Sequence, residues 1–290
     1  MKFSALIFGL SILFSTPQMS CQKGNGAEGD KPLVALDMKK VAYGPDTIQN
    51  MDVYLPANRD TANTKVILFI HGGGWNSGDK NDFNVDIGAI RKDIPDYAVF
   101  NINYHLAANG TNRFPVQISD IDLALNYIES QALQYKINTN KICLIGASAG
   151  AHLALLYAYK NNRGGKIKAI IDLFGPADLT DMYNNHPIPL QARPVLVNFL
   201  GTTPAANPEI YRDASPVNFI NAQSVPTRIF HGGADIVVPI KQSTALKDKL
   251  QANNVKVEMT TYSTEGHGWY GNNLLDTYVK AVKFIKENVY

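Results

Sequence analysis

From about Leu33 onward, short apolar runs alternate with longer stretches of helical character. This alternation is typical of a mostly parallel sheet whose two faces are covered by helices. The run Val66–Ile70 is apolar at every position, as expected of a strand buried on both faces. We see no internal repeat and no second core. The chain therefore predicts one α/β domain over residues 33–290.

The first two strands are separated only by a turn around Gly44, Pro45 and Asp46, which predicts an antiparallel entry to the sheet. The expected strands lie near residues 38–43, 51–55, 66–70, 97–104, 141–145, 169–174, 227–231 and 255–262. The expected helices lie near residues 83–92, 115–128, 149–160, 240–252 and 274–287.

The alternation breaks between residues 175 and 225, in a segment rich in Pro, Asn and Ala. This segment is longer than an ordinary connection between a strand and a helix. Long connections often carry function, because they lie at the surface on a rigid scaffold. We therefore expect residues 175–225 to form a cap or lid after the sixth strand.

The N-terminus has the pattern of a targeting segment. Lys2 precedes an apolar run, residues 3–14, which is too short to span a bilayer but suits a signal peptide. Residues 1–20 are therefore the predicted signal peptide. The residues before Cys21 resemble a bacterial lipoprotein signal, although Gln18 stands where an aliphatic residue is usual.

The predicted anchor is a lipid on Cys21, followed by a flexible tether, residues 21–32, with polar and Gly-rich composition. We therefore expect an exported lipoprotein of the periplasm or outer membrane, in contact with the membrane only through this lipid. Plain secretion after cleavage near Ser20 is the alternative.

Charge and cysteine content exclude several classes of partner. The 27 basic and 25 acidic residues are scattered, so there is no basic stripe for a nucleic acid. The chain has two cysteines, Cys21 and Cys143, and Cys143 lies in an apolar run, so no disulfide framework is expected. No H-E-x-x-H motif or clustered Cys and His occurs, and we expect no metal and no cofactor.

A serine between glycines is the sharpest chemical signal in the chain. Gly146-Ala147-Ser148-Ala149-Gly150 lies between an expected strand and an expected helix. Glycines two residues before and after the serine let the strand and helix approach closely, and the tight turn exposes the serine hydroxyl. Ser148 is therefore the candidate nucleophile.

A second signal is His71-Gly72-Gly73-Gly74-Trp75, which follows the buried strand Val66–Ile70. Without side chains, consecutive backbone N–H groups can point into one cavity and bind an oxygen that becomes negative during acyl transfer. The pairing of this loop with a G-x-S-x-G turn is a known pattern. Gly73 and Gly74, together with Ala149, are the candidate oxyanion donors.

An acid and a histidine follow the serine in the order that such a fold requires. Asp235 comes directly after one expected strand, and His267 follows the next. Because parallel strands end at the same edge of the sheet, we expect both beside Ser148. His267 is the predicted general base, and Asp235 the acid that orients it.

Other acids and histidines compete less well. Asp172, Asp178 and Asp213 could each replace Asp235. His105, His152 and His186 have no strand-end acid before them, and His71 and His231 are expected to shape their loops. Among aromatic residues, Trp75, Trp269 and Tyr270 flank the candidate loops and could stack on a sugar or aryl ring, although core packing explains them equally well.

With these motifs the chain resembles the esterase branch of the α/β-hydrolases related to hormone-sensitive lipase. It is more similar still to bacterial carbohydrate-esterase-like members typical of Bacteroidetes. The resemblance rests on the motifs above, continued by Gly78-Asp79-Lys80, by Ala151-His152-Leu153-Ala154, by Tyr211-Arg212-Asp213-Ala214-Ser215-Pro216 and by Gly266-His267-Gly268.

The resemblance implies an α/β-hydrolase fold and a serine carboxylesterase of the feruloyl, acetyl or xylan esterase kind, acting on small-molecule or carbohydrate esters. Ala147 departs from the family pattern, which usually has an acidic residue there, and the family's N-terminal cap helices are missing. These departures favour short-chain acyl or aryl esters over long-chain lipids. Arylformamidases share much of the pattern, so a formamidase or amidase stays open, as does a non-catalytic binding protein on the same scaffold.

Overall fold

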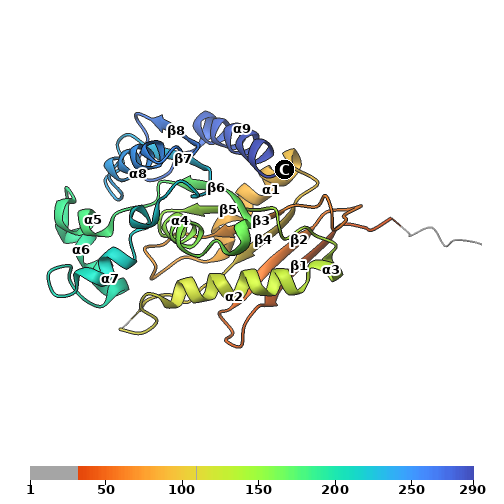
Figure 1. The fold of residues 1–290 in the computed structure, drawn as a ribbon, viewed down its shortest axis with the longest axis horizontal. Helices are drawn as coiled ribbons and strands as arrows, with labels where there is room; N and C mark the ends of the chain where they lie inside the picture. The colour runs from red at the N-terminus through yellow and green to blue at the C-terminus, as the bar shows by residue number, and fades with distance from the viewer. Residues whose placement is uncertain (1–31, 109) are drawn as a thin grey trace, which may run out of the picture. The chain divides into compact units, whose positions relative to one another are not determined.

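Eight strands form one sheet in the order β1-β2-β4-β3-β5-β6-β7-β8 within the described part of the chain (Figure 1). β1 pairs with β2, and β2 with β4, in antiparallel fashion, whereas the six strands from β4 to β8 in this order are parallel to one another. The strands are β1 (Leu36–Ala42), β2 (Asn50–Leu55), β3 (Val66–Ile70), β4 (Ala98–Ile102), β5 (Ile142–Ala147), β6 (Ile167–Leu173), β7 (Thr227–Gly232) and β8 (Val257–Tyr262). The predicted mostly parallel sheet with an antiparallel entry is confirmed.

This structure is a computed structural model that describes residues 32–108 and 110–290. Residues 33–290 form one unit. The predicted signal peptide, the candidate lipidation site Cys21 and all but the last residue of the predicted tether lie outside the described residues.

Helices cover both faces of the sheet, as the alternation predicts (Figure 1). The helices are α1 (Asn84–Asp93), α2 (Val116–Ser130), α3 (Ala132–Tyr135), α4 (Ala149–Asn161), α5 (Leu179–Asn185), α6 (Pro189–Leu200), α7 (Pro208–Asp213), α8 (Lys241–Ala252) and α9 (Gly271–Asn288). Short 3-10 turns occur at η1 (Lys80–Phe83), η2 (Arg163–Gly165) and η3 (Pro216–Phe219). α1 and α9 pack on one face, and α2, α4 and α8 on the other.

The central strand β3 shows why the sheet needs two covering layers. All five of its residues are buried. Val66, Leu68 and Ile70 belong to the core under α2 and α4, whereas Ile67 and Phe69 belong to the core under α1 and α9. Successive side chains of a strand point to opposite faces, so an unbroken apolar run requires helices on both.

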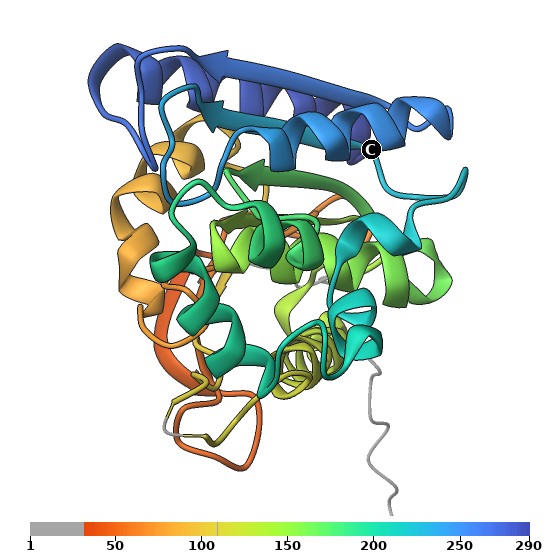
Figure 2. The same cartoon turned by 90° about the vertical axis from the view of Figure 1, so that its left-hand side faces the viewer.

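The predicted cap segment folds into α5, α6, α7 and η3, which lie at the left of the sheet in Figure 1 and face the viewer in Figure 2. α5 packs against α6 and α7. Phe199 and Tyr211 are fully buried and belong to the same core as α4. The cap is therefore built into the core on the α4 side of the sheet.

Candidate active site

Ser148 occupies the turn between β5 and α4 with φ 53° and ψ −118°, a strained conformation for a residue with a side chain. Its N–H donates to the Leu173 carbonyl at 2.8 Å. A Cβ on Gly146 would lie 2.4 Å from the Gly150 carbonyl oxygen, and one on Gly150 would lie 2.0 Å from that of Ile70. Both glycines are needed because α4 starts in backbone contact with its neighbouring strands.

The structure brings together the three residues that the sequence singles out. His267 Nε2 lies 2.8 Å from Ser148 Oγ, and His267 Nδ1 lies 2.7 Å from Asp235 Oδ2. The three come from the loops that follow β5, β7 and β8. The Asp235 side chain is fully buried, whereas that of His267 is one-fifth exposed, at 20%. This is the arrangement of a serine nucleophile, its general base and an orienting acid.

Asp235 is held as a carboxylate from several sides. Oδ1 accepts hydrogen bonds from the N–H groups of Val237 and Val238, at 2.8 and 3.0 Å. Burial by itself would raise the pKa of Asp235, but hydrogen bonds from His231 and His267 outweigh it and hold that pKa well below its usual range. Asp235 therefore stays ionised and can stabilise a positive charge on His267.

His231 also contacts Asp235, a role that the sequence analysis did not predict. It is fully buried, and its Nε2 lies 2.8 Å from the Val238 carbonyl oxygen and 3.3 Å from Asp235 Oδ2. Because a carbonyl only accepts, Nε2 must carry a proton, and Nδ1 can accept from the Ser243 hydroxyl at 2.7 Å. A weak sequence signal exists, since His231 lies four residues before Asp235.

The glycine loop passes directly beside the serine. A Cβ on Gly72 would lie 2.9 Å from the Ala147 carbonyl oxygen and 3.4 Å from Ser148 Cβ. Gly73 and Gly74 have φ angles of 103° and 56°. Among the described residues, the N–H groups of Gly73, Gly74 and Ala149 make no hydrogen bond. These three candidate donors are therefore free to bind an oxyanion.

A cavity of about 90 Å³ opens at Ser148. Gly74 and Ala149 line it on the side of the oxyanion loop, whereas Gly73 does not. The cap completes it with Met182, His186, Gln191, Ala192, Val195 and Leu196. His186 was not predicted to lie at the site. Its Nδ1 accepts from Ile188 N–H at 2.9 Å, so its Nε2 carries the proton and donates to the Val237 carbonyl oxygen. The cap thus shapes a small and mostly apolar space next to Ser148.

The two tryptophans line cavities but are largely buried. Trp75 lines the small cavity but is only 4% exposed. Its ring stacks on that of Phe199, with 4.4 Å between the ring centroids, and its indole N–H donates to His152 Nδ1 at 3.2 Å. Trp269 is 6% exposed and donates to Thr277 Oγ1 at 2.9 Å. Core packing therefore accounts for most of their surface.

The competing acids lie away from His267 in the described contacts. Asp178 caps α5 by accepting from the N–H of Asp181, and Asp213 pairs with Arg212. Asp172 is fully buried on β6, and one oxygen accepts from the Gly175 N–H at 2.8 Å. Burial raises the pKa of Asp172 to about 7.

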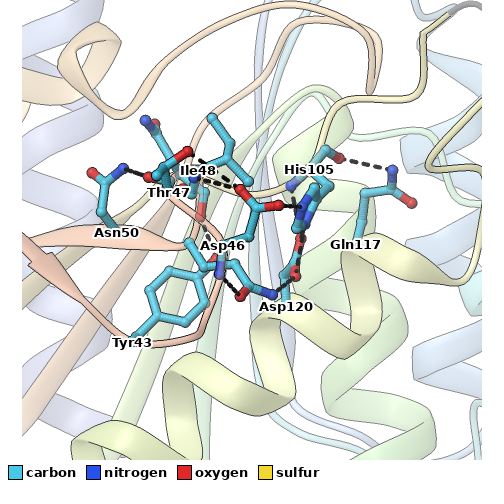
Figure 3. A network of polar contacts seen from close by, with 10 residues as sticks. Tyr43, Asp46, Thr47, Ile48, Asn50, His105, Gln117 and Asp120 are labelled. Carbon is cyan, nitrogen blue, oxygen red and sulfur yellow. Dashed lines mark hydrogen bonds and ion pairs between the residues drawn. The ribbon is translucent and has the colours of Figure 1, made fainter.

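The remaining histidines have structural partners. His152 is buried between Trp75 and the Ala214 carbonyl oxygen, and burial lowers its pKa to about 4. His105 lies between two carboxylates, 2.9 Å from Asp120 and 3.4 Å from Asp46, and its backbone N–H also donates to Asp120 (Figure 3). This network joins the turn after β1 to α2.

Within residues 32–108 and 110–290, no group of three or more His, Cys, Asp or Glu side chains is placed to hold a metal ion. Cys143 is buried and free. No helix in this part of the chain is long and apolar enough to cross a membrane.

Comparison with known proteins gives both a family and relatives. The sequence pattern of the BD-FAE family matches residues 51–250. The chain is 26% identical over 255 residues to the esterase LipC of Mycobacterium tuberculosis, covering 82% of this chain and 60% of LipC. It is also 26% identical over 234 residues to a kynurenine formamidase of Meyerozyma guilliermondii, covering 76% of this chain and 83% of that protein.

Among solved structures, a truncated carbohydrate esterase from gut microbiota is similar, with a TM-score of 0.73 and 25% identity, covering 89% of this chain and 97% of that one. The chain spans less than two thirds of the length of the first curated relatives that it matches.

Proposed function

We propose that this chain, which belongs to the BD-FAE family, is a serine hydrolase that cleaves carboxylic esters through an acyl-enzyme on Ser148. The observation that carries the proposal is the continuous hydrogen-bonded line from Ser148 Oγ through His267 to Asp235. The similarity to LipC and to a carbohydrate esterase supports the same class of reaction.

In the first step, Ser148 Oγ attacks the ester carbonyl carbon while His267 Nε2 takes the hydroxyl proton. The carbonyl oxygen becomes negative and is stabilised by the free N–H groups of the glycine loop and of Ala149. When the tetrahedral intermediate collapses, the alcohol leaves with the proton from His267. Water then repeats the sequence on the acyl-enzyme, so that the acid leaves and Ser148 regains its proton.

The small cavity favours short acyl groups. A space of about 90 Å³ beside Ser148 suits an acetyl to butyryl chain and leaves no room for a long lipid chain. Residues of the cap, such as Met182 and Leu196, close its far side. Acetyl esters of plant polysaccharide have an acyl group of this size, so the small cavity admits them; the part of the site that binds the alcohol decides whether they are preferred.

The direct test uses a fluorophosphonate probe and a series of p-nitrophenyl esters. The probe should label the wild-type chain at Ser148, and kcat/KM should fall as the acyl chain grows beyond four carbons. The control is Ser148→Ala, which should lose both labelling and turnover. Absence of labelling in the folded wild-type protein would instead favour a non-catalytic binding protein.

A formamidase is the second candidate, because this chain aligns with 83% of the length of the kynurenine formamidase relative. The same triad can attack a formamide carbonyl, and a formyl group fits the small cavity. Turnover of an N-formyl aryl substrate faster than that of p-nitrophenyl acetate would favour this alternative.

For localisation we propose export and attachment to a bacterial membrane through a lipid on Cys21. The support is the sequence pattern of residues 1–32 alone: Lys2 before a short apolar run, then Cys21 and a polar tether.

A further inference from the structure

A second cavity, of about 370 Å³, lies on the other face of the sheet, between α1 and α9. Its walls are mostly apolar and aromatic side chains from the ends of β3, β5 and β6 and from the two helices. The aromatic members are Phe69, Phe83, Phe174, Trp269, Tyr270 and Tyr278. Cavities of this size and character commonly bind small organic molecules.

This large cavity borders the catalytic residues along one side. It is lined by Gly72, Ala147 and Gly268, which are chain neighbours of Gly73, Ser148 and His267. Phe174 also lines it, and its ring lies 4.6 Å from the ring of His267 between centroids. The small cavity instead touches Ser148, Gly74 and Ala149 and ends in the cap. The two cavities therefore flank the nucleophile on different sides.

The chemistry of ester hydrolysis indicates which cavity binds the acyl group and which binds the alcohol. The oxygen of the leaving alcohol receives its proton from His267, so the alcohol must depart on the side of that histidine. The acyl group stays bonded to Ser148 and must fit next to the oxyanion donors. The large cavity, lined by Phe174 and Gly268, lies on the side of His267 and is therefore assigned to the alcohol. The small cavity, lined by Ser148, is assigned to the acyl group.

We propose that the large cavity binds the alcohol part of the substrate, so that the preferred substrates are esters of a short acid with a bulky, apolar alcohol. This assignment rests on the proposed ester hydrolysis and adds the substrate class to it. Two carboxylates, Asp82 and Asp86, line the cavity, and no basic side chain of the described residues does. The alcohol is therefore neutral or cationic, because an anionic group would meet only like charges.

The aromatic walls give the cavity its affinity for ring systems. Tyr278 donates to Asp86 Oδ1 at 2.8 Å, which fixes one wall, and Trp269 packs against Phe174 at 5.4 Å between ring centroids. Aromatic pairs with this spacing stabilise a rigid slot. An aryl or fused-ring alcohol would pack its ring faces against these side chains.

The test compares two isomers in which the ester is reversed. In 2-naphthylmethyl acetate the ring is in the alcohol, whereas in methyl 2-naphthylacetate it is in the acid, and both leaving groups are alkoxides. The proposal predicts that kcat/KM for the first isomer exceeds that for the second by about 10-fold or more, since one well-fitted apolar group is worth that much discrimination. Equal values, or a preference for the second isomer, would overturn the assignment.

Filling the cavity should remove the preference. Ala281→Phe places a ring in the cavity from α9, where Ala281 is 3% exposed, and should raise KM for 2-naphthylmethyl acetate by about 10-fold. Leu274→Trp fills the cavity from a partly exposed position and gives the same readout if the first variant does not fold. The matched control is Val279→Phe, because Val279 lies on α9, is 66% exposed and does not line the cavity.

The outcomes separate this inference from the proposed function. If the wild-type chain hydrolyses p-nitrophenyl acetate but does not distinguish the isomers, only the cavity assignment is wrong. If it hydrolyses no ester and Ser148 takes no fluorophosphonate, ester hydrolysis itself is wrong. Retention of wild-type KM for 2-naphthylmethyl acetate in both filled variants would also remove the cavity from the substrate site.

Discussion

His231 Nε2 lies 3.3 Å from Asp235 Oδ2, the same carboxylate oxygen that accepts the hydrogen bond from His267. The acid of the candidate triad is thus held between two imidazoles, one buried and one facing the serine. Because Val238 O and Ser243 Oγ fix the buried ring, His231 limits where the carboxylate can turn.

We therefore expect His231→Asn to lower kcat by about 10-fold with little change in KM, because a less firmly held Asp235 orients His267 less well. The comparison variant is Ser243→Ala, which removes one contact of the ring and should have a smaller effect. Steady-state kinetics over a range of pH checks the prediction. A His231→Asn enzyme with wild-type kcat at every pH would leave His231 a purely structural role.

Asp235→Asn is expected to keep the shape of the site but to favour the wrong tautomer of His267, so kcat should fall by up to about 10⁴-fold. KM should change little. Asp172→Asn, Asp178→Asn and Asp213→Asn should each keep most of the activity, because none of these acids contacts His267. A larger loss at any of these three positions than at position 235 would show that the acid has been assigned wrongly.

Asp172 should make the stability of the chain depend on pH. Burial raises its pKa from 3.8 to about 7, so the folded chain keeps this proton up to about pH 7, whereas the unfolded chain loses it near pH 4. The stabilisation from the protonated carboxyl is therefore complete below about pH 4 and is lost as the pH rises to about 7.

Asp172→Asn should remove this dependence, since its amide does not titrate. Urea unfolding at several pH values from 4 to 8, on both proteins, gives the difference in unfolding free energy. As the pH rises to about 7, the unfolding free energy of the wild-type chain should fall by a few kcal/mol relative to that of the Asp172→Asn variant. Above pH 7 the difference between the two should stay constant. A difference that does not vary with pH would mean that Asp172 is ionised throughout.

Cys21→Ala tests the proposed lipid anchor. In a bacterial host with lipoprotein processing, the wild-type chain should fractionate with membranes, and the variant should be recovered without detergent at an unchanged kcat. Incorporation of labelled palmitate into the wild-type chain alone would support the same conclusion. Recovery of the wild-type chain in the soluble fraction would argue for plain secretion.

The order of the strands and of the five helices that cover the sheet follows from the sequence alone, because apolar periodicity is a local property of the chain, whereas α3 and the cap helices α5, α6 and α7 were not predicted. The serine turn also follows from the sequence, since Gly146 and Gly150 leave no side chain between α4 and its neighbouring strands. Chain order placed Asp235 and His267 after consecutive strands, and parallel strands end at the same edge. These features need no knowledge of distant contacts.

Which side chains meet depends on the tertiary fold. His267 contacts Asp235 across 32 residues and Ser148 across 119, and no local pattern encodes such contacts. The burial of Trp75 and Trp269, the support from His231 and the two cavities likewise depend on how the helices pack against the sheet. Packing is a property of the whole core, since the space beside a residue is set by neighbours that lie far away in the chain.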